Sequence, residues 1–335
     1  MSAARSFRPT RVVAIGASAG GVDALQQLVA ALPAGFPGAI CVVLHIPATG
    51  RSLLAPILDR AGPLAAEQAV HGTRLQGGRI YVAPPDRHLT VHGDRLELDR
   101  GPKENGVRPS VDPLFRSLAA SWDSARIAVV LSGALDDGAS GAATVAASGG
   151  TVVVQELADA LVPSMPENAL AAARGARVAP IEEMVDLLVE LANEPAPEET
   201  VTMAPNPNSF ELAVSPERPD GPPSAFTCPE CSGALWELRE GELVRYQCRV
   251  GHTYSEEAFV DSQASTVEAA LWTALEVLEE RGELLARIAD RRSNRHSRSA
   301  ERFRKAAREA LERAELIRRA LHVRGADEAR EAAAG

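Results

Sequence analysis

Short runs of β-branched and aliphatic residues alternate with amphipathic stretches over residues 10–193. The stretch at 22–32, for example, places its leucines and a valine at the spacing of one helix face. Such alternation is typical of an α/β fold with a doubly wound, mainly parallel sheet and flanking helices. The predicted strands are 11–16, 39–44, 79–83, 126–131 and 151–155, and an antiparallel hairpin inserted at an edge of the sheet is predicted over 88–98.

The pattern changes after this predicted domain. Prolines recur every few residues over 194–225 without an apolar face, which is typical of an extended linker. A compact cysteine-bearing segment follows at 226–256, and 262–330 is rich in Ala, Glu, Arg and Leu. Apolar residues there recur every three or four positions on both sides of a polar break at 293–299, so we predict a helical hairpin or coiled coil, packed on itself or on a second copy as a homodimer. The recurring positions are Val267, Leu271, Ala274, Leu278, Leu285 and Ile288, then Phe303, Ala307, Ala310, Ala314, Ile317 and Leu321.

Composition narrows the classes of function. A chain of 335 residues can bury one full-sized core and still form a smaller module. A net charge of −10 argues against binding along a nucleic-acid backbone, although the arginine-rich stretch 287–299 keeps a nucleic-acid-binding regulator as a weaker third interpretation. The basic N-terminus lacks the apolar core of a signal peptide, and no apolar run is long enough to span a membrane. We therefore expect a cytoplasmic protein without membrane insertion.

Three residues that can form a nucleophile, a base and an orienting carboxylate each follow a predicted strand. They are Ser18, His45 and Asp137. A serine hydroxyl becomes a good nucleophile when an imidazole takes its proton, and a carboxylate fixes the imidazole tautomer. The carboxyl ends of parallel strands meet at one edge of a sheet, where ligands bind in this fold class, so we expect the three residues to meet there.

Ser18 lies in the glycine-rich turn GASAGG (16–21), which would expose the hydroxyl and leave backbone N–H groups for an oxyanion. The same turn nearly matches the dinucleotide-binding fingerprint. Two departures count against a nucleotide: a serine replaces the second glycine, and the next strand ends at His45 where an acidic residue is expected. On spacing alone, Asp136 or Asp137 can be the orienting carboxylate, with the other capping the following helix.

Several ordered motifs resemble the CheB family, the chemotaxis protein-glutamate methylesterases, over roughly residues 10–192. IGASAGG (15–21) resembles the nucleophile loop, VVLHIP (42–47) the histidine motif and LSGALDDGASG (131–141) the aspartate loop. Three further segments match: YVAPPDRHL (81–89), RPSVDPLFRSLA (108–119), and QELADALVPSMPENAL (155–170) with its Met165-Pro166 pair.

The resemblance implies Ser18 as nucleophile, His45 as general base and, through alignment of Gly138, Asp137 as triad carboxylate. It implies hydrolysis of glutamate γ-methyl esters on chemoreceptors or related signalling proteins, with release of methanol and with glutamine deamidation by the same route, and no cofactor for catalysis. Two positions depart from the family pattern: Ala19 stands where threonine is common and Ala134 where methionine is common. The strand carrying Ser18 begins about ten residues into the chain, so we expect no N-terminal receiver domain and no control through its phosphorylation.

Three of the four cysteines cluster with a histidine. Cys228 and Cys231 form C-x2-C, and Cys248 and His252 form C-x3-H after a predicted hairpin. The pattern predicts a zinc-ribbon-like module with a structural zinc, because four protein ligands leave no position for a reactive water. Unligated cytoplasmic thiols are the alternative.

Two classes of function remain at this point. The first is a serine esterase of the receptor-methylesterase type. The second is a catalytically silent scaffold or signalling adaptor that acts through the zinc module and the helical tail. Retention of Ser18, His45 and Asp137 together favours the enzyme, since a scaffold does not need all three.

Overall fold

The computed structural model describes residues 9–121, 126–194, 219–240, 243–292 and 297–334. The chain divides into two compact units, one ending at Phe259 and one beginning at Val260. Among these described residues no helix has the length and apolar character needed to cross a membrane.

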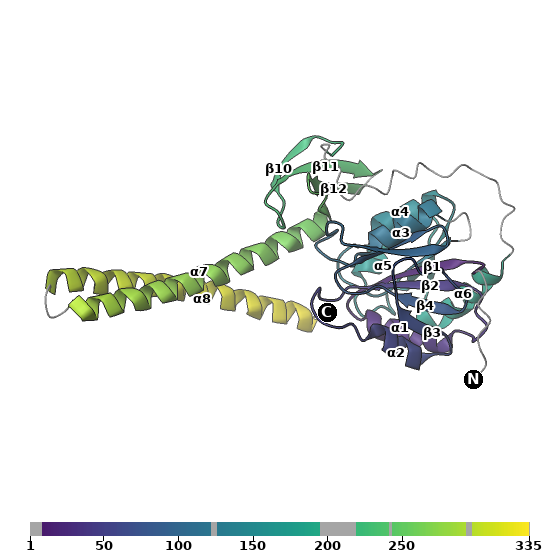
Figure 1. Ribbon diagram of the computed structural model, residues 1–335, viewed down its shortest axis with the longest axis horizontal. Coiled ribbons are helices and arrows are strands. Elements are labelled where there is room, and N and C mark those ends of the chain that lie inside the picture. The colour runs from purple at the N-terminus through teal and green to yellow at the C-terminus, as the bar shows by residue number, and fades with distance from the viewer. Residues whose placement is uncertain (1–8, 122–125, 195–218, 241–242, 293–296, 335) are drawn as a thin grey trace. The chain divides into compact units, whose positions relative to one another are not determined.

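A seven-stranded, fully parallel sheet forms the centre of the first unit (Figure 1). Its strand order is β3-β4-β2-β1-β7-β8-β9, so the chain builds outward from β1 first in one direction and then in the other. The carboxyl ends of β1 and β7 therefore border the switch point at which ligands bind in doubly wound folds. The strands are β1 (Val12–Ala17), β2 (Ala39–Leu44), β3 (Ala65–Gln68), β4 (Arg79–Val82), β7 (Arg126–Val130), β8 (Thr151–Gln155) and β9 (Arg177–Ala179).

Helices cover both faces of this sheet because alternate strand side chains form two separate cores. In β1, Val13 and Ile15 face one core, and Val12 and Ala14 face the other. Figure 1 shows α1 and α2 on one side of the sheet and α3 and α4 on the other. The first core is covered by α1 (Gly21–Ala31), α2 (Leu54–Ala61) and α6 (Ile181–Asn193), the second by α3 (Val111–Ser121), α4 (Ala139–Ala147) and α5 (Ser164–Ala172).

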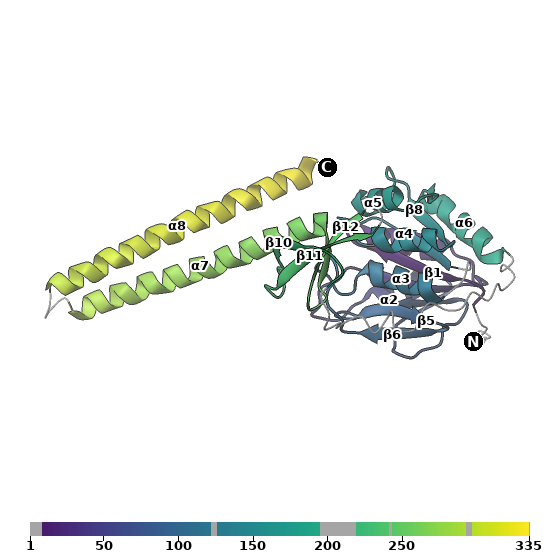
Figure 2. The ribbon, with the colours of Figure 1, turned by 90° about the horizontal axis from the view of Figure 1, so that it is seen from above.

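The predicted α/β fold class is confirmed, and all five predicted strands are present within a residue at each end. The sequence pattern missed β3 and β9, which are short edge strands without an alternating apolar pattern. The hairpin of β5 (His88–His92) and β6 (Arg95–Asp99) turns at Gly93 as predicted. Its predicted place at the sheet edge is wrong, because it forms a separate two-stranded sheet packed against α3 (Figure 2).

A four-stranded antiparallel sheet follows, which we call the ribbon. Only a small apolar cluster fills it, and that cluster includes Tyr246, Tyr254 and Phe259. Residues 195–218 of the predicted linker lie outside the described residues, and the first ribbon strand begins within the predicted linker range. The ribbon strands are β10 (Pro223–Thr227), β11 (Ala234–Glu240), β12 (Leu243–Cys248) and β13 (Thr253–Ser255).

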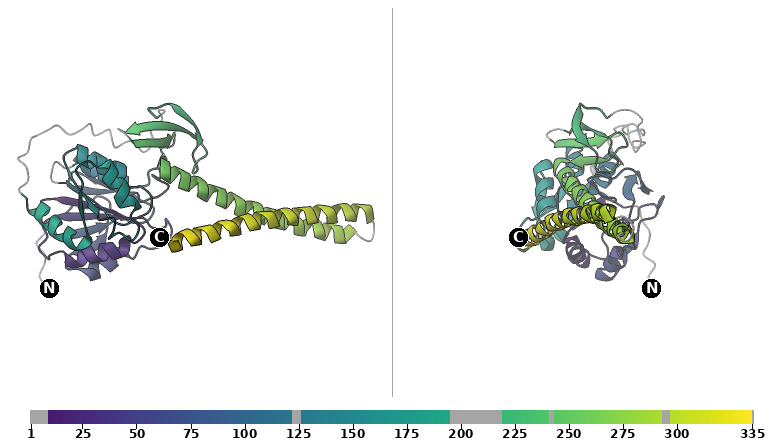
Figure 3. Two further views of the ribbon diagram at one scale, coloured as in Figure 1. Left: turned by 180° about the vertical axis from the view of Figure 1, so that it is seen from behind. Right: turned by 90° about the vertical axis from the view of Figure 1, so that its left-hand side faces the viewer.

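The second unit is an antiparallel helical hairpin, as predicted, formed by α7 (Glu256–Arg292) and α8 (Ser297–Ala334) (Figure 3). Leu275 packs with Ala314 and Leu321, and a Cβ at Gly282 would lie 2.7 Å from Leu311. Residues 293–296 of the predicted polar break lie outside the described residues.

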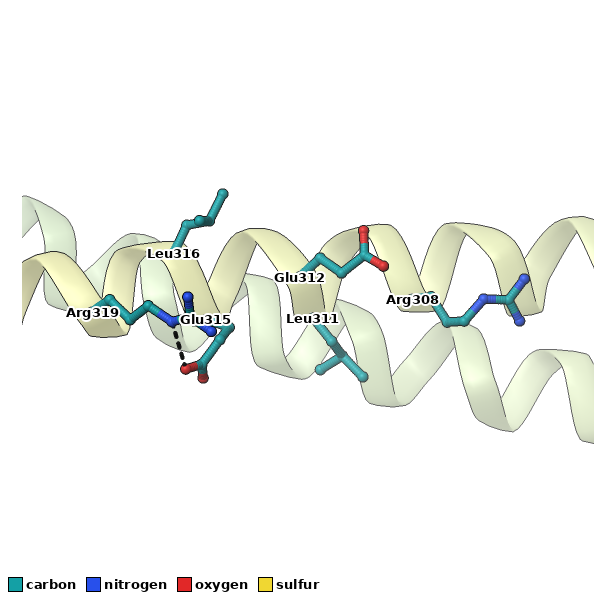
Figure 4. Close-up of a pocket in the computed structure, with 6 residues that line it drawn as sticks. All are labelled: Arg308, Leu311, Glu312, Glu315, Leu316 and Arg319. Atoms are coloured by element: carbon teal, nitrogen blue, oxygen red, sulfur yellow. Dashed lines mark hydrogen bonds and ion pairs between the residues drawn. The ribbon is translucent and has the colours of Figure 1, made fainter.

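One side of α8 carries an open groove with mixed charges (Figure 4). Leu311 points toward α7, Leu316 points away from it, and Arg319 donates to Glu315. Such alternating charge is typical of a solvated helix face. Residues lining the groove are Arg308, Leu311, Glu312, Glu315, Leu316 and Arg319.

Candidate active site

The register of the sheet brings Ser18 and His45 to the same edge. Ala17 of β1 lies opposite Leu44 of β2, so each residue follows its strand at an equivalent position. The His45 N–H extends this ladder by donating to the Ala17 carbonyl over 3.2 Å. Both residues remain partly exposed. The main chain alone therefore sets the separation of the two residues.

The turn at Ser18 requires its small neighbours. Gly20 has a φ of 75°, and a Cβ there would lie 2.7 Å from Ser132 Oγ. A Cβ at Gly133 would lie 2.9 Å from the Cβ of Ser18. Ser18 N–H donates to the Ser132 carbonyl over 3.0 Å, which ties the turn to the end of β7. Since α1 begins at Gly21, the positive end of its dipole lies beside the serine.

His45 pairs with Asp137. Its Nε2 lies 2.7 Å from Asp137 Oδ2, and the aspartate side chain is only 2% exposed. An ionised carboxylate only accepts hydrogen bonds, so Nε2 carries the proton and Nδ1 is left as the acceptor. Asp137 thus lies against His45, although it is seven residues beyond the end of β7.

Asp137 accepts hydrogen bonds on both carboxylate oxygens. Burial raises its pKa, but hydrogen bonds from His45, the Val111 N–H and Ser110, with the charge of His45, lower it further than burial raises it, so the net shift is downward. Oδ2 accepts from His45 and from Val111 N–H at 2.6 Å, and Oδ1 from Asn105 at 3.0 Å, Ser110 at 2.7 Å and Asp112 N–H at 3.3 Å. The carboxylate is therefore held ionised, as the orienting group of a triad must be.

The two adjacent aspartates have different partners. Asp136 Oδ1 accepts from Ser255 Oγ over 2.6 Å, whereas Asp137 accepts from His45. Burial raises the pKa of Asp136, while the hydrogen bond from Ser255 opposes that rise. Spacing left either aspartate open as the orienting group, and the geometry favours Asp137.

Sequence reasoning missed the residues around this carboxylate. Asn105 was not singled out, and Ser110 and Asp112 stood only within a matching family segment. Asp112 is 2% exposed and accepts from Gly141 N–H over 2.7 Å. Burial raises its pKa to about 6, with Arg245 opposing the rise and Asp137 adding to it. An aspartate between the apolar residues Val111 and Leu114 was the sequence signal that could have found it.

A cavity of about 300 Å³ lies next to His45. Its lining includes Leu44 and Ile46, which flank the histidine in sequence, together with Leu53 and Ile57. Leu53 is 66% exposed, so this side of the cavity presents apolar surface to solvent. An apolar surface thus adjoins the proposed reaction site.

The cysteine cluster of the ribbon brings four possible ligands together. Cys228, Cys231, Cys248 and His252 offer ligand atoms that all lie within 4.8 Å of one another. The Sγ atoms of Cys231 and Cys248 are 3.6 Å apart, too far for a disulfide, and His252 Nδ1 lies 3.6 Å from Cys228 Sγ and from Cys248 Sγ. Thiolates at about 2.3 Å from a tetrahedral zinc lie at nearly this separation, so the donor set fits such an ion.

Known proteins resemble the first unit. The family model described as CheB methylesterase matches residues 13–188, a little over half of the chain. A protein from Paramagnetospirillum magneticum, named protein-glutamate methylesterase/protein-glutamine glutaminase 1, is 38% identical over 55% of this chain and 50% of its own length. A similarly named protein from Anaeromyxobacter dehalogenans is 44% identical over 48% of each chain.

A solved structure shows the same likeness. The crystal structure of the Thermotoga maritima CheB methylesterase catalytic domain is 34% identical, has a TM-score of 0.52, and is covered over 98% of its length by 54% of this chain. The chain spans about half the length of the curated relatives it matches. On the family match, the shared fold and the ordered motifs, the chain belongs to the CheB methylesterase family.

Proposed function

We propose that this chain is a serine hydrolase that removes the methyl group from glutamate γ-methyl esters of chemoreceptor-type proteins. The observation that carries the proposal is the 2.7 Å contact of His45 with an ionised, buried Asp137, beside Ser18 on the neighbouring strand end. The names of the relatives, which pair methylesterase with glutaminase, support the same substrates and add glutamine deamidation.

We assign a role to each group. His45 Nδ1 takes the proton of Ser18 as the hydroxyl attacks the ester carbonyl, and Asp137 stabilises the imidazolium through Nε2. The N–H of Ala19, at the N-terminal end of α1, is the oxyanion donor that we assign, and alanine in place of threonine leaves this backbone donor intact. Methanol leaves with the proton from His45, and water then releases glutamate from the acyl-enzyme. A glutamine substrate loses ammonia by the same steps.

The apolar cavity beside His45 suits a receptor helix as substrate. Leu53 and Ile57 line this cavity together with Leu44 and Ile46, the residues that flank His45 in sequence. A methylated glutamate on an amphipathic helix brings neighbouring apolar side chains to the same surface. We therefore infer that receptor side chains next to the ester pack in this cavity.

Methanol release from methylated receptor fragments tests the proposal. The full chain should release methanol, and Ser18→Ala should not. A fluorophosphonate probe should label the wild type at Ser18. No release and no labelling, under conditions in which another methylesterase is active, would favour the alternative of a catalytically silent scaffold.

We further propose that the ribbon holds one structural zinc through Cys228, Cys231, Cys248 and His252. The support is the donor set and its spacing, since three thiolates and an imidazole suit zinc and leave no open position. A cluster as small as the ribbon core gains much of its stability from such an ion. One equivalent of zinc by elemental analysis is expected after purification without chelators, and protein without zinc contradicts the assignment.

We also propose that α7 forms a homodimer with a second copy. Val260, Val267, Val277 and Leu284 are each more than half exposed and fall on the a and d positions of one heptad frame. Leu275, by contrast, is buried against α8. Light scattering should give twice the monomer mass, and Val277→Glu with Leu284→Glu should give the monomer. A wild-type monomer at micromolar concentration contradicts this proposal.

A further inference from the structure

The ribbon is hydrogen-bonded to the loop that holds the triad carboxylate. Asn105 N–H donates to the Thr253 carbonyl over 2.8 Å, and Ser255 N–H donates to Asn105 Oδ1 over 3.0 Å. Both partners belong to β13. Asn105 is only 7% exposed, so β13 fixes its main chain and its side-chain oxygen together.

The other end of the same amide faces two buried carboxylates. Asn105 Nδ2 lies 3.0 Å from Asp137 Oδ1 and 3.3 Å from Asp112 Oδ2. Because β13 fixes the oxygen, the amide cannot flip without giving up one set of partners. Asn105 thus joins the ribbon directly to the carboxylate that contacts His45.

A buried arginine of the ribbon reaches the same place. Arg245 of β12 is 3% exposed, and its Nη2 lies 3.2 Å from Glu104 Oε2 and 3.5 Å from Asp112 Oδ2. Its Nη1 lies 3.2 Å from Ser140 Oγ. A buried charge is tolerated only when it is paired, so this guanidinium and the carboxylates around it depend on each other.

These contacts approach the active site from the side of Asp137. Ser18 and His45 remain partly exposed, and Ala19 is exposed. The ribbon contacts described above lie behind the carboxylate and leave the nucleophile open. Such an arrangement supports the triad and does not block it.

We propose that the ribbon is a working part of the active site, in which Asn105 and Arg245 act as positioning residues that hold Asp137 against His45. The proposal rests on the proposed esterase function. It gives the cysteine cluster a consequence for catalysis, because β12 ends at Cys248 and β13 begins directly after His252. Any ion held by the cluster fixes the two strands that carry these contacts.

Steady-state kinetics of the full chain test the proposal. Asn105→Ala and Arg245→Gln should lower kcat about 10-fold to 100-fold, the range expected for a small displacement of a catalytic group, and change KM less than about threefold. Arg245→Lys keeps the charge and should recover part of the loss. Lys103→Ala is the matched control, since its ion pair with Glu230 joins the same two parts at the exposed surface over 2.7 Å. Its kcat should stay within about twofold of the wild type.

A spectroscopic measurement separates positioning from general stability. The Nε2 proton of His45, hydrogen-bonded to Asp137, should give a low-field proton NMR signal that moves upfield in Asn105→Ala and stays in place in Lys103→Ala. Thermal melting checks that each variant is folded. If Asn105→Ala does not fold, Arg245→Lys and Asn105→Ser carry the same test.

The outcomes are distinguishable. An active wild type whose kcat and NMR signal are unchanged in Asn105→Ala and Arg245→Gln overturns the positioning role. An equal loss in Lys103→Ala overturns it too, because docking alone would then explain the effect. A wild type that shows neither methanol release nor Ser18 labelling contradicts the proposed function. The NMR signal of His45 then still reports whether the ribbon holds Asp137.

Discussion

The two sides of the proposed triad are built by different means. Ser18 and His45 follow neighbouring strands, and the β1–β2 ladder fixes them through main-chain hydrogen bonds. Asp137 lies in a loop, where side chains and N–H groups from 105–112 hold it in place. Main-chain hydrogen bonds set the register at the strand edge, whereas the position of a loop carboxylate depends on every donor around it.

This difference predicts how substitutions on each side of the site affect catalysis. Changes at the strand edge should act by removing chemistry. Changes in the loop should act by moving or neutralising a carboxylate. Asn105, which is bonded to the ribbon, contacts Asp137, and Arg245 of the ribbon contacts the adjacent Asp112. The loop side is therefore where another part of the chain can influence the reaction.

Ser18→Ala should have the largest effect. Removing the hydroxyl leaves the fold intact, because alanine fits the space of serine, and should lower kcat by about 10⁶-fold, as for other serine nucleophiles. Methanol release from methylated receptor fragments measures it. Melting temperature serves as the control and should stay unchanged. Residual activity within 100-fold of the wild type would move the nucleophile to another residue.

Asp137→Asn should rank second and tests the loop side. The amide can donate to His45 Nε2, which places the imidazole proton on Nδ1 and removes the acceptor that faces Ser18. A kcat loss of about 10⁴-fold is expected, as for wrong-tautomer variants of other triads. Asp136→Asn is the matched control, since Asp136 accepts from Ser255 and not from His45. Equal losses in both variants contradict the assignment of Asp137.

The strand edge was predictable from the sequence and the loop was not. Apolar runs predicted β1, β2 and β7. Because parallel strands end at one edge of the sheet, the sequence alone predicted that Ser18 and His45 lie near each other. Spacing left Asp136 and Asp137 equivalent, because the choice depends on which carboxylate turns toward His45. Only the family resemblance selected one of them in advance.

The contacts behind Asp137 had no signal in the pattern. Asn105 is a polar residue in a loop, and its role arises from a ribbon strand 150 residues away in sequence. Arg245 sits in a strand whose sequence pattern gives no sign that the arginine is buried. Edge strands β3 and β9 were missed for a related reason: whether these short segments form strands depends on their neighbours in space, and not on a local periodic pattern.

Gly133→Ala should have an intermediate effect. It tests the place where the serine turn packs against the loop that carries Asp137. The added Cβ would lie 2.9 Å from the Cβ of Ser18 and closer still to Met165 Sδ, so the methionine and the serine turn must both shift. We expect kcat to fall about 10-fold to 100-fold. Gly35→Ala is the control, because no atom lies within 4 Å of its added Cβ. Unchanged kcat in Gly133→Ala shows that the turn tolerates displacement.

The smallest expected effect concerns two buried carboxylates, Asp112 of α3 and Asp137 of the loop, whose pKa values shift in opposite directions. Burial raises the pKa of Asp112 to about 6, opposed by Arg245 and helped by Asp137, whereas the net shift of Asp137 is downward. With a folded pKa above the unfolded value, folded Asp112 binds its proton more tightly, so its contribution to stability falls as pH rises from about 4 to about 6 and is flat above that. Asp112→Asn removes this titration.

The unfolding free energy of the wild type minus that of Asp112→Asn should therefore fall by about 2 kcal/mol over this window. Chemical denaturation at a series of pH values measures it. Loss of the proposed zinc at low pH would affect both proteins and cancel in the difference. Asp186→Asn, at an exposed position of α6, is the control for removing a carboxylate at the surface. A difference that rises with pH would mean that Asp112, like Asp137, is held ionised. The positive charge of Arg245 would then outweigh the effect of burial on the pKa of Asp112, and the ribbon would stabilise charge at the site more strongly than we expect.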